Sequence, residues 1–449
     1  MKLPAVFEAR MAELLQTEYP VYRESMEQPP FLGLRVNTLK ISVEDFLKIA
    51  PFRLTPIPWV PEGFYYEEGD RPTKHPFYHA GLYYIQEPSA MFPVTLLDPP
   101  PGAVVLDTCA APGGKSCQIA ARLGGEGLLL TNDISASRAK ALLHNIEISG
   151  IRNAVVLCED PPRLVPRLVR RLTHMLVDAP CSGEGMFRKA DGVIKAWGPD
   201  RPAEFRAMQD PLLEAAAGLL APGGALVYST CTFNRLENEE AIGDFLGRHG
   251  DFSQDPREIP EVSPGLPDAT GAVPESLYRL WPQRHKGEGH FAARLLREGA
   301  PEGEPWPLEA CNEPPAEFAS FAAQYLPAWQ EEGVYRQFGE RLLLMPRHRL
   351  DLAGLRVIRA GWYLGDVKKG RFEPSQALAL GLKAVQFAQR LDFDPEDPEL
   401  IRYIKGETLH RDCPRGWILV SVAGYPLGWA KGLDGMLKNH YPAAWRRLD

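Results

Sequence analysis

Short apolar runs alternate with helix-like segments between residues 100 and 230 of the chain. The runs are too short for helices and end in polar or glycine-rich stretches, which is typical of strands buried on both faces of a sheet. Strands are predicted at Val104–Leu106, Leu128–Leu130, Val155–Leu157, Met175–Val177 and Leu226–Tyr228, with helices that include Ala136–Ile148 and Asp210–Leu220. This alternation predicts an α/β fold with a Rossmann-like, doubly wound and mostly parallel sheet.

The regions on either side of this sheet have different patterns. Residues 3–15 have helical apolar spacing and residues 31–39 have strand character, which together predict a small N-terminal α+β domain. Residues 291–297 are expected to form a last strand of the central domain. Residues 298–315 carry five prolines and several glutamates, a composition typical of linkers. We therefore predict domains at residues 1–75, 76–297, 298–375 and 376–449.

Composition is that of a soluble globular protein, with 45% hydrophobic and 24% charged residues in 449. No apolar run approaches the ~20 residues that span a bilayer, and the N-terminus lacks the apolar core of a signal peptide. The seven cysteines are odd in number and widely spaced, without a Cys-x-x-Cys pair, which argues against a disulfide framework or a zinc site. We expect a cytoplasmic protein, a monomer, with no metal and no membrane partner.

The net charge of −8 is unevenly distributed and does not exclude a nucleic-acid partner. Residues 251–340 hold 16 acidic and 7 basic side chains, whereas residues 401–449 hold 4 acidic and 8 basic ones. Two basic groups are candidates for phosphate contacts, and the second lies among C-terminal aromatics that can stack on bases. They are Arg163, Arg167, Arg170 and Arg171, and Lys431, Lys438, Arg446 and Arg447. A solvated helix face and the core of a small β-barrel are the competing interpretations.

A glycine-rich turn, Cys109-Ala-Ala-Pro-Gly-Gly-Lys115, follows the first predicted strand of the sheet and precedes a helix. Glycines there allow backbone N–H groups to approach an anionic ligand at the helix N-terminus. A phosphate-binding P-loop requires glycine at position 109, and the dinucleotide fingerprint Gly-x-Gly-x-x-Gly is absent. The remaining type is a turn that binds S-adenosylmethionine.

Acidic residues follow the next two predicted strands. Asp133 is placed to accept the ribose hydroxyls of such a cofactor, and Asp160 to meet its adenine amino group. An aspartate at a strand end is more often a helix cap. Together with the glycine turn, however, the two would share the carboxyl edge of one sheet, where these folds bind ligands.

Two cysteines, Cys181 and Cys231, also follow strands at that edge, and Asp178 lies three residues before the first. A lone cysteine in this position is usually a small buried hydrophobe. Methylation of a pyrimidine at C5 nevertheless requires a thiolate that adds to C6, a carboxyl group at N3 and a group that assists elimination. Lys115, Arg188 and Lys189 are candidates to supply the positive charge that a thiolate needs.

Several motifs of the chain resemble those of the RNA 5-methylcytosine methyltransferases. The resemblance extends from about residue 30 to 297, and the C-terminal segment is similar to the PUA-like β-barrel of ribosomal members of the family. The motifs are Cys109-Ala-Ala-Pro-Gly-Gly-Lys, Asp178-Ala-Pro-Cys-Ser-Gly-Glu-Gly, Tyr228-Ser-Thr-Cys-Thr-Phe-Asn, Arg35-Val-Asn-Thr-Leu-Lys, Gln86-Glu-Pro-Ser-Ala-Met, Gly287-Glu-Gly-His-Phe-Ala-Ala and Gly424-Tyr-Pro-Leu-Gly-Trp-Ala-Lys.

The resemblance implies roles that the spacing leaves open. DNA cytosine methyltransferases use a Pro-Cys nucleophile, which would indicate Cys181, whereas the RNA family implies that Cys231 is the nucleophile. Cys181 then assists product release, Asp178 contacts the base, and Lys115 supports them. The implied cofactor-binding residues are Cys109, Ala110, Ala111, Pro112, Gly113, Gly114, Lys115, Asp133, Arg138, Asp160 and Asp178. Asp160 is followed by two prolines, where family members often have a small residue, so it is the weakest match.

The implied reaction is S-adenosylmethionine-dependent methylation of cytosine C5 in RNA. By resemblance to the ribosomal members, the expected substrate is 16S rRNA in the decoding region of the small subunit. Two alternatives stay open: a tRNA cytosine-C5 methyltransferase, which would share the catalytic motifs, and a non-catalytic RNA-binding factor in ribosome assembly.

Overall fold

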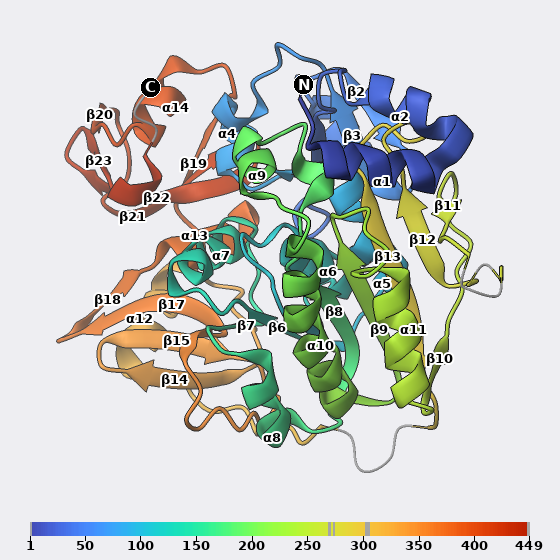
Figure 1. The fold of residues 1–449 in the computed structure, drawn as a ribbon. Coiled ribbons are helices and arrows are strands. Elements are labelled where there is room, and N and C mark those ends of the chain that lie inside the picture. Colours follow the sequence, from blue (N-terminus) through green and yellow to red (C-terminus); the bar gives the residue numbers. More distant parts are fainter. Residues whose placement is uncertain (1, 268–270, 273, 301–305, 447–449) are drawn as a thin grey trace.

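The structure is a computed structural model that describes residues 2–267, 271–272, 274–300 and 306–446. Its largest sheet has ten strands, and the five at its centre run parallel in the order β9-β8-β5-β6-β7 (Figure 1). They are β5 Val104–Asp107, β6 Leu128–Asn132, β7 Ala154–Leu157, β8 Leu172–Asp178 and β9 Leu220–Thr230. The predicted doubly wound parallel sheet is therefore confirmed, and each predicted strand lies within one of these.

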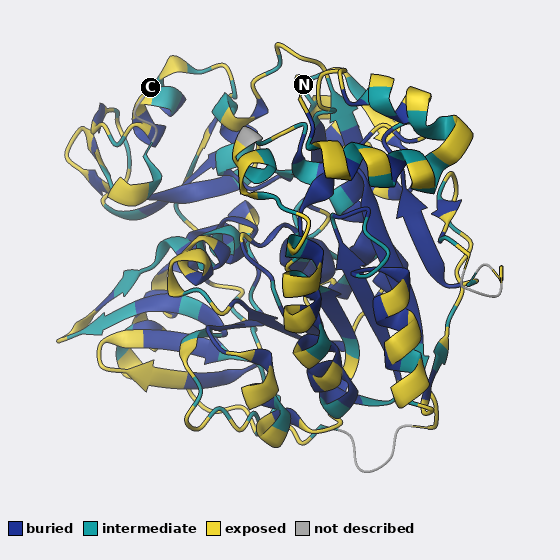
Figure 2. Cartoon of the chain, in the orientation of Figure 1, coloured by how far each residue is buried: buried dark blue, intermediate teal, exposed yellow. Residues whose placement is uncertain are grey.

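Helices on both faces of the sheet bury the strands. Side chains that alternate along β5 and β6 enter two separate cores, with Leu106 and Leu130 on one face and Val105 and Leu129 on the other. Figure 2 shows the strands almost fully buried and the outer faces of α10 and α11 exposed. The helices of this domain are α5 Phe92–Leu97, α6 Gly114–Leu123, α7 Ala136–Ile148, α8 Val165–Leu168, α9 Asp191–Ala196, α10 Arg201–Leu219 and α11 Glu239–Arg248.

The two clearest helix predictions had different outcomes. The helix predicted at Ala136–Ile148 is present with those bounds, and the Ser135 side chain caps its N-terminus. The helix predicted from Asp210 begins at Arg201 instead. Its first half buries Arg206 and Gln209, so tertiary contacts extend the helix through Pro211, where local sequence favours a helix start.

Antiparallel strands extend the sheet on both sides. β13 His290–Arg297, which includes the predicted strand at 291–297, pairs with β9 and is followed outward by β12 Leu277–Leu280 and β11 Ser263–Pro264, while β10 Phe252–Gln254 also pairs with β13. On the other side, β16 Val357–Ala360 pairs with β7. This strand comes from the region predicted as a separate C-terminal domain, and it covers a sheet edge that would otherwise be open.

The N-terminal segment forms a four-stranded sheet with helices, which agrees with the predicted α+β domain. The strand order is β2-β3-β1-β4, and β4 lies beyond residue 75. The elements are α1 Ala5–Leu15, α2 Tyr19–Ser25, β1 Gly33–Val36, α3 Val43–Ile49, β2 Leu54–Ile57, β3 Val60–Tyr66, α4 Pro76–His79 and β4 Tyr83–Ile85.

Two further sheets follow in the C-terminal region. The sheet that comes last in the chain shares a hydrophobic core with the N-terminal sheet, in which Leu34 and Phe64 pack with Val420 and Leu427. The N-terminal domain and the last C-terminal domain therefore pack together (Figure 1). The first sheet has the order β14-β15-β17-β18 and the second β19-β21-β22-β23-β20. The elements are α12 Ala316–Tyr325, β14 Val334–Phe338, β15 Arg341–Met345, β17 Trp362–Lys368, β18 Arg371–Pro374, α13 Gln376–Gly381, β19 Arg390–Phe393, α14 Pro398–Ile404, β20 Leu409–His410, β21 Gly416–Val422, β22 Tyr425–Leu433 and β23 Met436–Asn439.

Candidate active site

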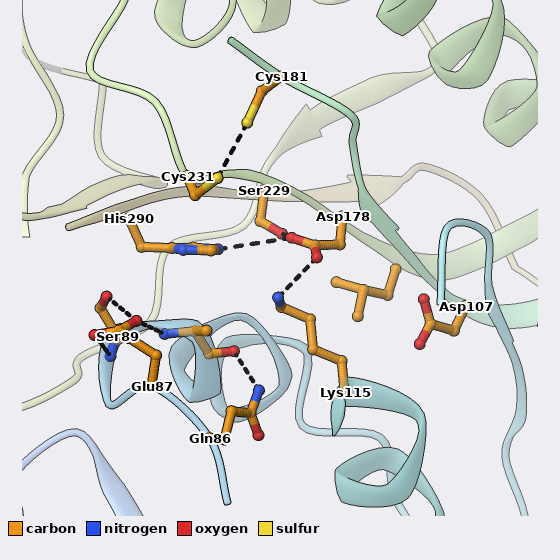
Figure 3. A network of polar contacts seen from close by, with 12 residues as sticks. Gln86, Glu87, Ser89, Asp107, Lys115, Asp178, Cys181, Ser229, Cys231 and His290 are labelled. Carbon is orange, nitrogen blue, oxygen red and sulfur yellow. Dashed lines mark hydrogen bonds and ion pairs between the residues drawn. The ribbon is translucent and has the colours of Figure 1, made fainter. Parts of the chain in front are cut away.

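The two cysteines that follow β8 and β9 meet at the carboxyl edge of the sheet. Cys231 comes directly after β9, and Cys181 lies in the loop after β8. Their Sγ atoms are 3.3 Å apart, and both side chains are half-buried (Figure 3). Because the strands are parallel neighbours, their ends bring together residues 50 positions apart in the chain.

Buried polar contacts fix the loop that carries Cys181. Ser182 donates its backbone N–H to Glu237 Oε2 at 2.8 Å, and Gln209 Nε2 donates to the Pro180 carbonyl at 2.9 Å and to Glu237 Oε2 at 3.1 Å. Burial raises the pKa of Glu237 to about 7. Glu237 is therefore a structural acceptor for this loop, whose position sets that of the Cys181 thiol.

A second contact joins this loop to the one after β9. The Gly185 N–H donates to the Cys231 carbonyl at 2.8 Å, and a Cβ on Gly185 would lie 2.8 Å from that same oxygen. Only glycine allows so close an approach without a backbone shift. The last position of the Asp178-Ala-Pro-Cys-Ser-Gly-Glu-Gly motif therefore requires glycine. The backbone contact between the two loops helps to set the distance between the two thiols.

Asp178, at the end of β8, lies between the cysteines and the glycine turn. Lys115 Nζ donates to its Oδ2 at 2.7 Å and Ser229 Oγ to its Oδ1 at 2.7 Å, while His290 Nε2 is 3.7 Å from Oδ1 (Figure 3). Burial alone would raise the pKa of Asp178, but the attraction of the Lys115 ammonium outweighs it and holds this pKa below its ordinary value. The carboxylate is ionised, and 27% of its side chain stays accessible to a ligand.

Three thiols of the central domain resist ionisation. The hydrogen bond that the Cys181 thiol donates to Cys231, together with burial, raises the pKa of Cys181 well above its ordinary value. Burial likewise raises the pKa of Cys109 to about 12 and that of Cys117 to about 11. Cys181, Cys109 and Cys117 therefore remain protonated near neutral pH, and none of them is prepared to act as a nucleophile.

The glycine turn has the close packing that its sequence predicts. Gly113 has φ +116°, a conformation that favours glycine, and a Cβ on Gly114 would lie 3.0 Å from Tyr84 Cε1. Asp133 is buried directly after β6 and accepts the Ala111 N–H at 3.3 Å. Arg138 donates to the Ala111 carbonyl at 2.7 Å, so the structure brings both predicted side chains to the turn.

Asp160 is the predicted cofactor residue with the least structural support. It is exposed and follows β7 as the residue before a short 3₁₀ helix, Pro161–Leu164. Its place at the carboxyl edge agrees with the prediction, whereas its helix-capping position is the competing interpretation that the sequence left open.

The basic residues proposed to supply charge or to bind phosphates mostly have structural partners. Arg188 pairs with Glu288 at 2.8 Å, with both side chains buried, and Lys189 is exposed. Arg163 pairs with Glu159 at 2.7 Å. Arg188 therefore fastens the loop after Cys181 to the segment before β13, and it is not free to stabilise a thiolate.

Other members of the first basic group hold the C-terminal region. Arg167 pairs with Asp351 at 2.7 Å, and the Arg171 guanidinium lies 5.9 Å from the Trp306 ring centre. In the last domain, Trp429 is buried, whereas Lys431 lies 5.6 Å from the ring centre of the half-buried Trp417. Most aromatics of that domain are thus core residues, and Arg447 lies outside the described residues.

Sequence reasoning missed three side chains of the site. Ser229 and His290 belong to motifs noted in the sequence, but the sequence did not show that both side chains face Asp178. Asp107, at the end of β5, accepts a hydrogen bond from Ser116 Oγ at 2.6 Å, and burial raises its pKa to about 7. Its Oδ1 has no hydrogen-bond partner within the part of the chain that the structure describes.

Comparison with known proteins identifies the family. The model of the 16S rRNA methyltransferases RsmB/F matches residues 94–296. The chain is 36% identical over 470 aligned positions to ribosomal RNA small subunit methyltransferase F of Enterobacter sp. (strain 638), an alignment that covers 98% of this chain and 95% of that one. The chain belongs to the RsmB/F family. The prediction that it is an RNA methyltransferase, and hence an enzyme, is confirmed.

Models of the flanking regions agree with this RsmB/F assignment. The N-terminal domain of RsmF matches residues 3–88, its first C-terminal domain matches residues 320–382, and its PUA domain matches residues 390–447. The predicted fold class, including the PUA-like C-terminal domain, is thereby confirmed. The domain limits proposed from the sequence remain predictions.

Other relatives of this RsmB/F member include an enzyme of the same name from Klebsiella pneumoniae, which is 35% identical with 98% of this chain covered and 95% of the relative. Among solved structures, a methyltransferase homolog protein from Pyrococcus horikoshii is 33% identical and superimposes with a TM-score of 0.59, covering 65% of this chain and 94% of that one. No helix in the described ranges is long and apolar enough to cross a membrane.

Proposed function

We propose that the protein methylates C5 of cytosine in 16S rRNA with S-adenosylmethionine as donor, in the decoding region of the small subunit. The observation that carries the proposal is the meeting of the two thiols and the ionised Asp178 at one edge of the sheet. Pyrimidine C5 methylation requires a nucleophile, a group that recognises the base and a group that assists elimination. The name of the relatives supports a small-subunit ribosomal substrate.

The residues around the glycine turn fit the cofactor. The buried Asp133 carboxylate is suited to accept ribose hydroxyls, and Asp107 offers a buried oxygen without a hydrogen-bond partner among the described residues. When bound, S-adenosylmethionine supplies an electrophilic methyl group. Gly113, Gly114 and Arg138 would shape its site, since Gly113 and Arg138 hold the turn close to α7 and Gly114 lies against Tyr84.

The chain's own groups divide the work of the reaction in this proposal. Cys231 adds through Sγ to C6, which makes C5 nucleophilic. Asp178, held in place by Lys115 and Ser229, is ionised and is suited to accept a hydrogen bond from the exocyclic amino group of the base, next to N3. Cys181 carries its proton beside the Cys231 sulfur and gives it a hydrogen bond as that thiolate leaves.

We expect Asp133→Ala to weaken S-adenosylmethionine binding about 10- to 100-fold. Hydrogen bonds to a carboxylate contribute roughly 1.5–3 kcal/mol each, and the variant removes the acceptor. Isothermal titration calorimetry measures the change in Kd. Glu126→Ala, which removes an exposed carboxylate in the loop before β6, is the control and should bind like the wild type. Equal affinities for the two variants would contradict a ribose contact by Asp133.

The test of the proposed function is transfer of tritium from methyl-labelled S-adenosylmethionine to 16S rRNA, to assembled small subunits and to tRNA. Label in 16S rRNA or subunits, at positions that bisulfite sequencing identifies as 5-methylcytosine, is the expected result. Label confined to tRNA would establish the tRNA alternative. Binding of rRNA without label in any substrate would favour the non-catalytic assembly factor.

A further inference from the structure

His290 is a buried side chain at the site to which no step above gives a role. It is the first residue of β13, and the register that pairs Phe291 with Thr230 places it across from Cys231. Only 3% of the side chain is exposed, and its Nε2 has no hydrogen-bond partner among the residues that the structure describes. Leaving a buried polar atom unpaired costs free energy, which is typical of an atom reserved for a ligand or a proton.

The His290 ring is oriented so that its Nε2 atom faces the reaction site. Figure 3 shows the ring beside Cys231, with Nε2 directed at Asp178, whose Oδ1 is 3.7 Å away. That separation is too long for a hydrogen bond but close enough for a carboxylate to stabilise an imidazolium. In this view the Lys115 ammonium lies below Asp178, and Asp107 lies farther away, to the right of Lys115. The ring lies beside Cys231, on the nucleophile side of the site.

The proposed reaction needs a proton acceptor close to the Cys231 sulfur. Once C5 carries both the methyl group and its original proton, that proton must leave before the C6–Sγ bond can break. C5 is bonded to C6, which Cys231 attacks, so the acceptor must lie within a few ångströms of the Cys231 sulfur.

Four other titratable groups near the site are less suitable as this acceptor. Cys181 retains its own proton because its pKa is raised, and Asp178 is a weak base because its pKa is held low by Lys115. Both oxygens of Glu237 already accept hydrogen bonds from Ser182. Asp107 lies beyond Lys115, away from Cys231 (Figure 3).

We infer that His290 Nε2 is the base that removes the C5 proton. The C5–H bond breaks and its proton forms an N–H bond on Nε2. The electron pair forms the C5–C6 double bond, and the C6–Sγ bond breaks to release the Cys231 thiolate. Asp178 stabilises the imidazolium, which then returns its proton to solvent. This assignment rests on the proposed function and divides elimination between a base, His290, and a thiol hydrogen-bond donor, Cys181.

The protonation state of the ring agrees with this role. Burial lowers the pKa of His290 below its ordinary 6.5, so the imidazole is neutral near pH 7, and in the tautomer with its proton on Nδ1 the Nε2 atom can accept a proton. Asp178 stays ionised, and Lys115 and Cys181 stay protonated, throughout the range below 6.5 where the ring titrates. Among the residues that the structure describes, Glu87 and Cys231 also face it.

The test is a single-turnover reaction on 16S rRNA that carries tritium at cytosine C5, with methyl-¹⁴C-labelled S-adenosylmethionine. His290→Gln should transfer the methyl group at close to the wild-type rate but release tritium about 10²-fold more slowly, which leaves a covalent protein–RNA adduct that carries ¹⁴C. Tritium release by the wild type should also slow as the pH falls through the pKa of His290, whereas release by His290→Gln should lose this dependence.

Controls separate this inference from the proposed function. His249→Gln changes a histidine at the C-terminal end of α11 that pairs with Glu214, and should behave like the wild type. Tritium release that keeps pace with methyl transfer in His290→Gln would overturn the role of His290 while leaving the methyltransferase proposal intact. No methylation by the wild type would instead overturn the proposed function. If His290→Gln fails to fold, His290→Phe, with an apolar ring of similar size, provides the same comparison.

Discussion

Cys231→Ala is expected to lower the rate of methyl transfer to rRNA by at least about 10⁴-fold, the scale on which enzymes respond to loss of a covalent nucleophile. Without a thiolate adding to C6, C5 of cytosine is too weak a nucleophile to take the methyl group. Single-turnover transfer from labelled S-adenosylmethionine measures the loss. The variant should still bind cofactor and RNA, because the alanine removes only the half-buried thiol group.

Cys413→Ala is the matched control for this prediction. Cys413 is also a half-buried thiol, but it lies in the last domain, where its Sγ contacts the Met436 carbonyl, and its loss should leave methyl transfer unchanged. Substantial activity in Cys231→Ala, together with a covalent adduct to its RNA, would show that the roles of the two active-site cysteines are reversed.

Cys181→Ala is expected to accumulate a covalent complex between protein and RNA. The Cys231 sulfur would still add to C6 and the methyl group would still be transferred. The departing thiolate would lose the hydrogen bond of the thiol that lies 3.3 Å away, and release should slow by roughly 10²-fold. Denaturing gel electrophoresis of the complex formed on labelled rRNA measures its accumulation and decay.

The double variant Cys181→Ala/Cys231→Ala checks the origin of this complex and should form none. Release of product by Cys181→Ala at the wild-type rate would exclude Cys181 from elimination and leave His290 as the group to be tested alone.

Much of the central fold could be predicted because its signals are local. Apolar runs of strand length separated by helical spacing give the parallel sheet, and Ser135 marks the start of α7. Pairings between distant segments leave no such local signal. The addition of β16 to the edge of β7, and the core shared by Leu34 and Val420, follow from contacts between regions hundreds of residues apart.

The function of the basic residues also could not be predicted from local sequence. A cluster such as Arg163, Arg167 and Arg171 has one appearance in the sequence whether it binds phosphates or fastens another domain. The carboxylate of Asp351 and the ring of Trp306 reveal the second role for this group. These partners are more than a hundred residues away, so composition and spacing could not have identified them.

By itself, the sequence determined the order of strands and helices in the central domain, the glycine turn and the two strand-end cysteines, because each depends on a few neighbouring residues. Only the tertiary structure decided that the thiols of Cys181 and Cys231 meet. It also decided that Asp178 lies between these thiols and the glycine turn, where Lys115 and Ser229 hold it by hydrogen bonds. It also placed the unpaired nitrogen of His290 beside them. The physical reason is that parallel strands align their carboxyl ends, so hydrogen bonding across the sheet, and not distance along the chain, sets which side chains can react together.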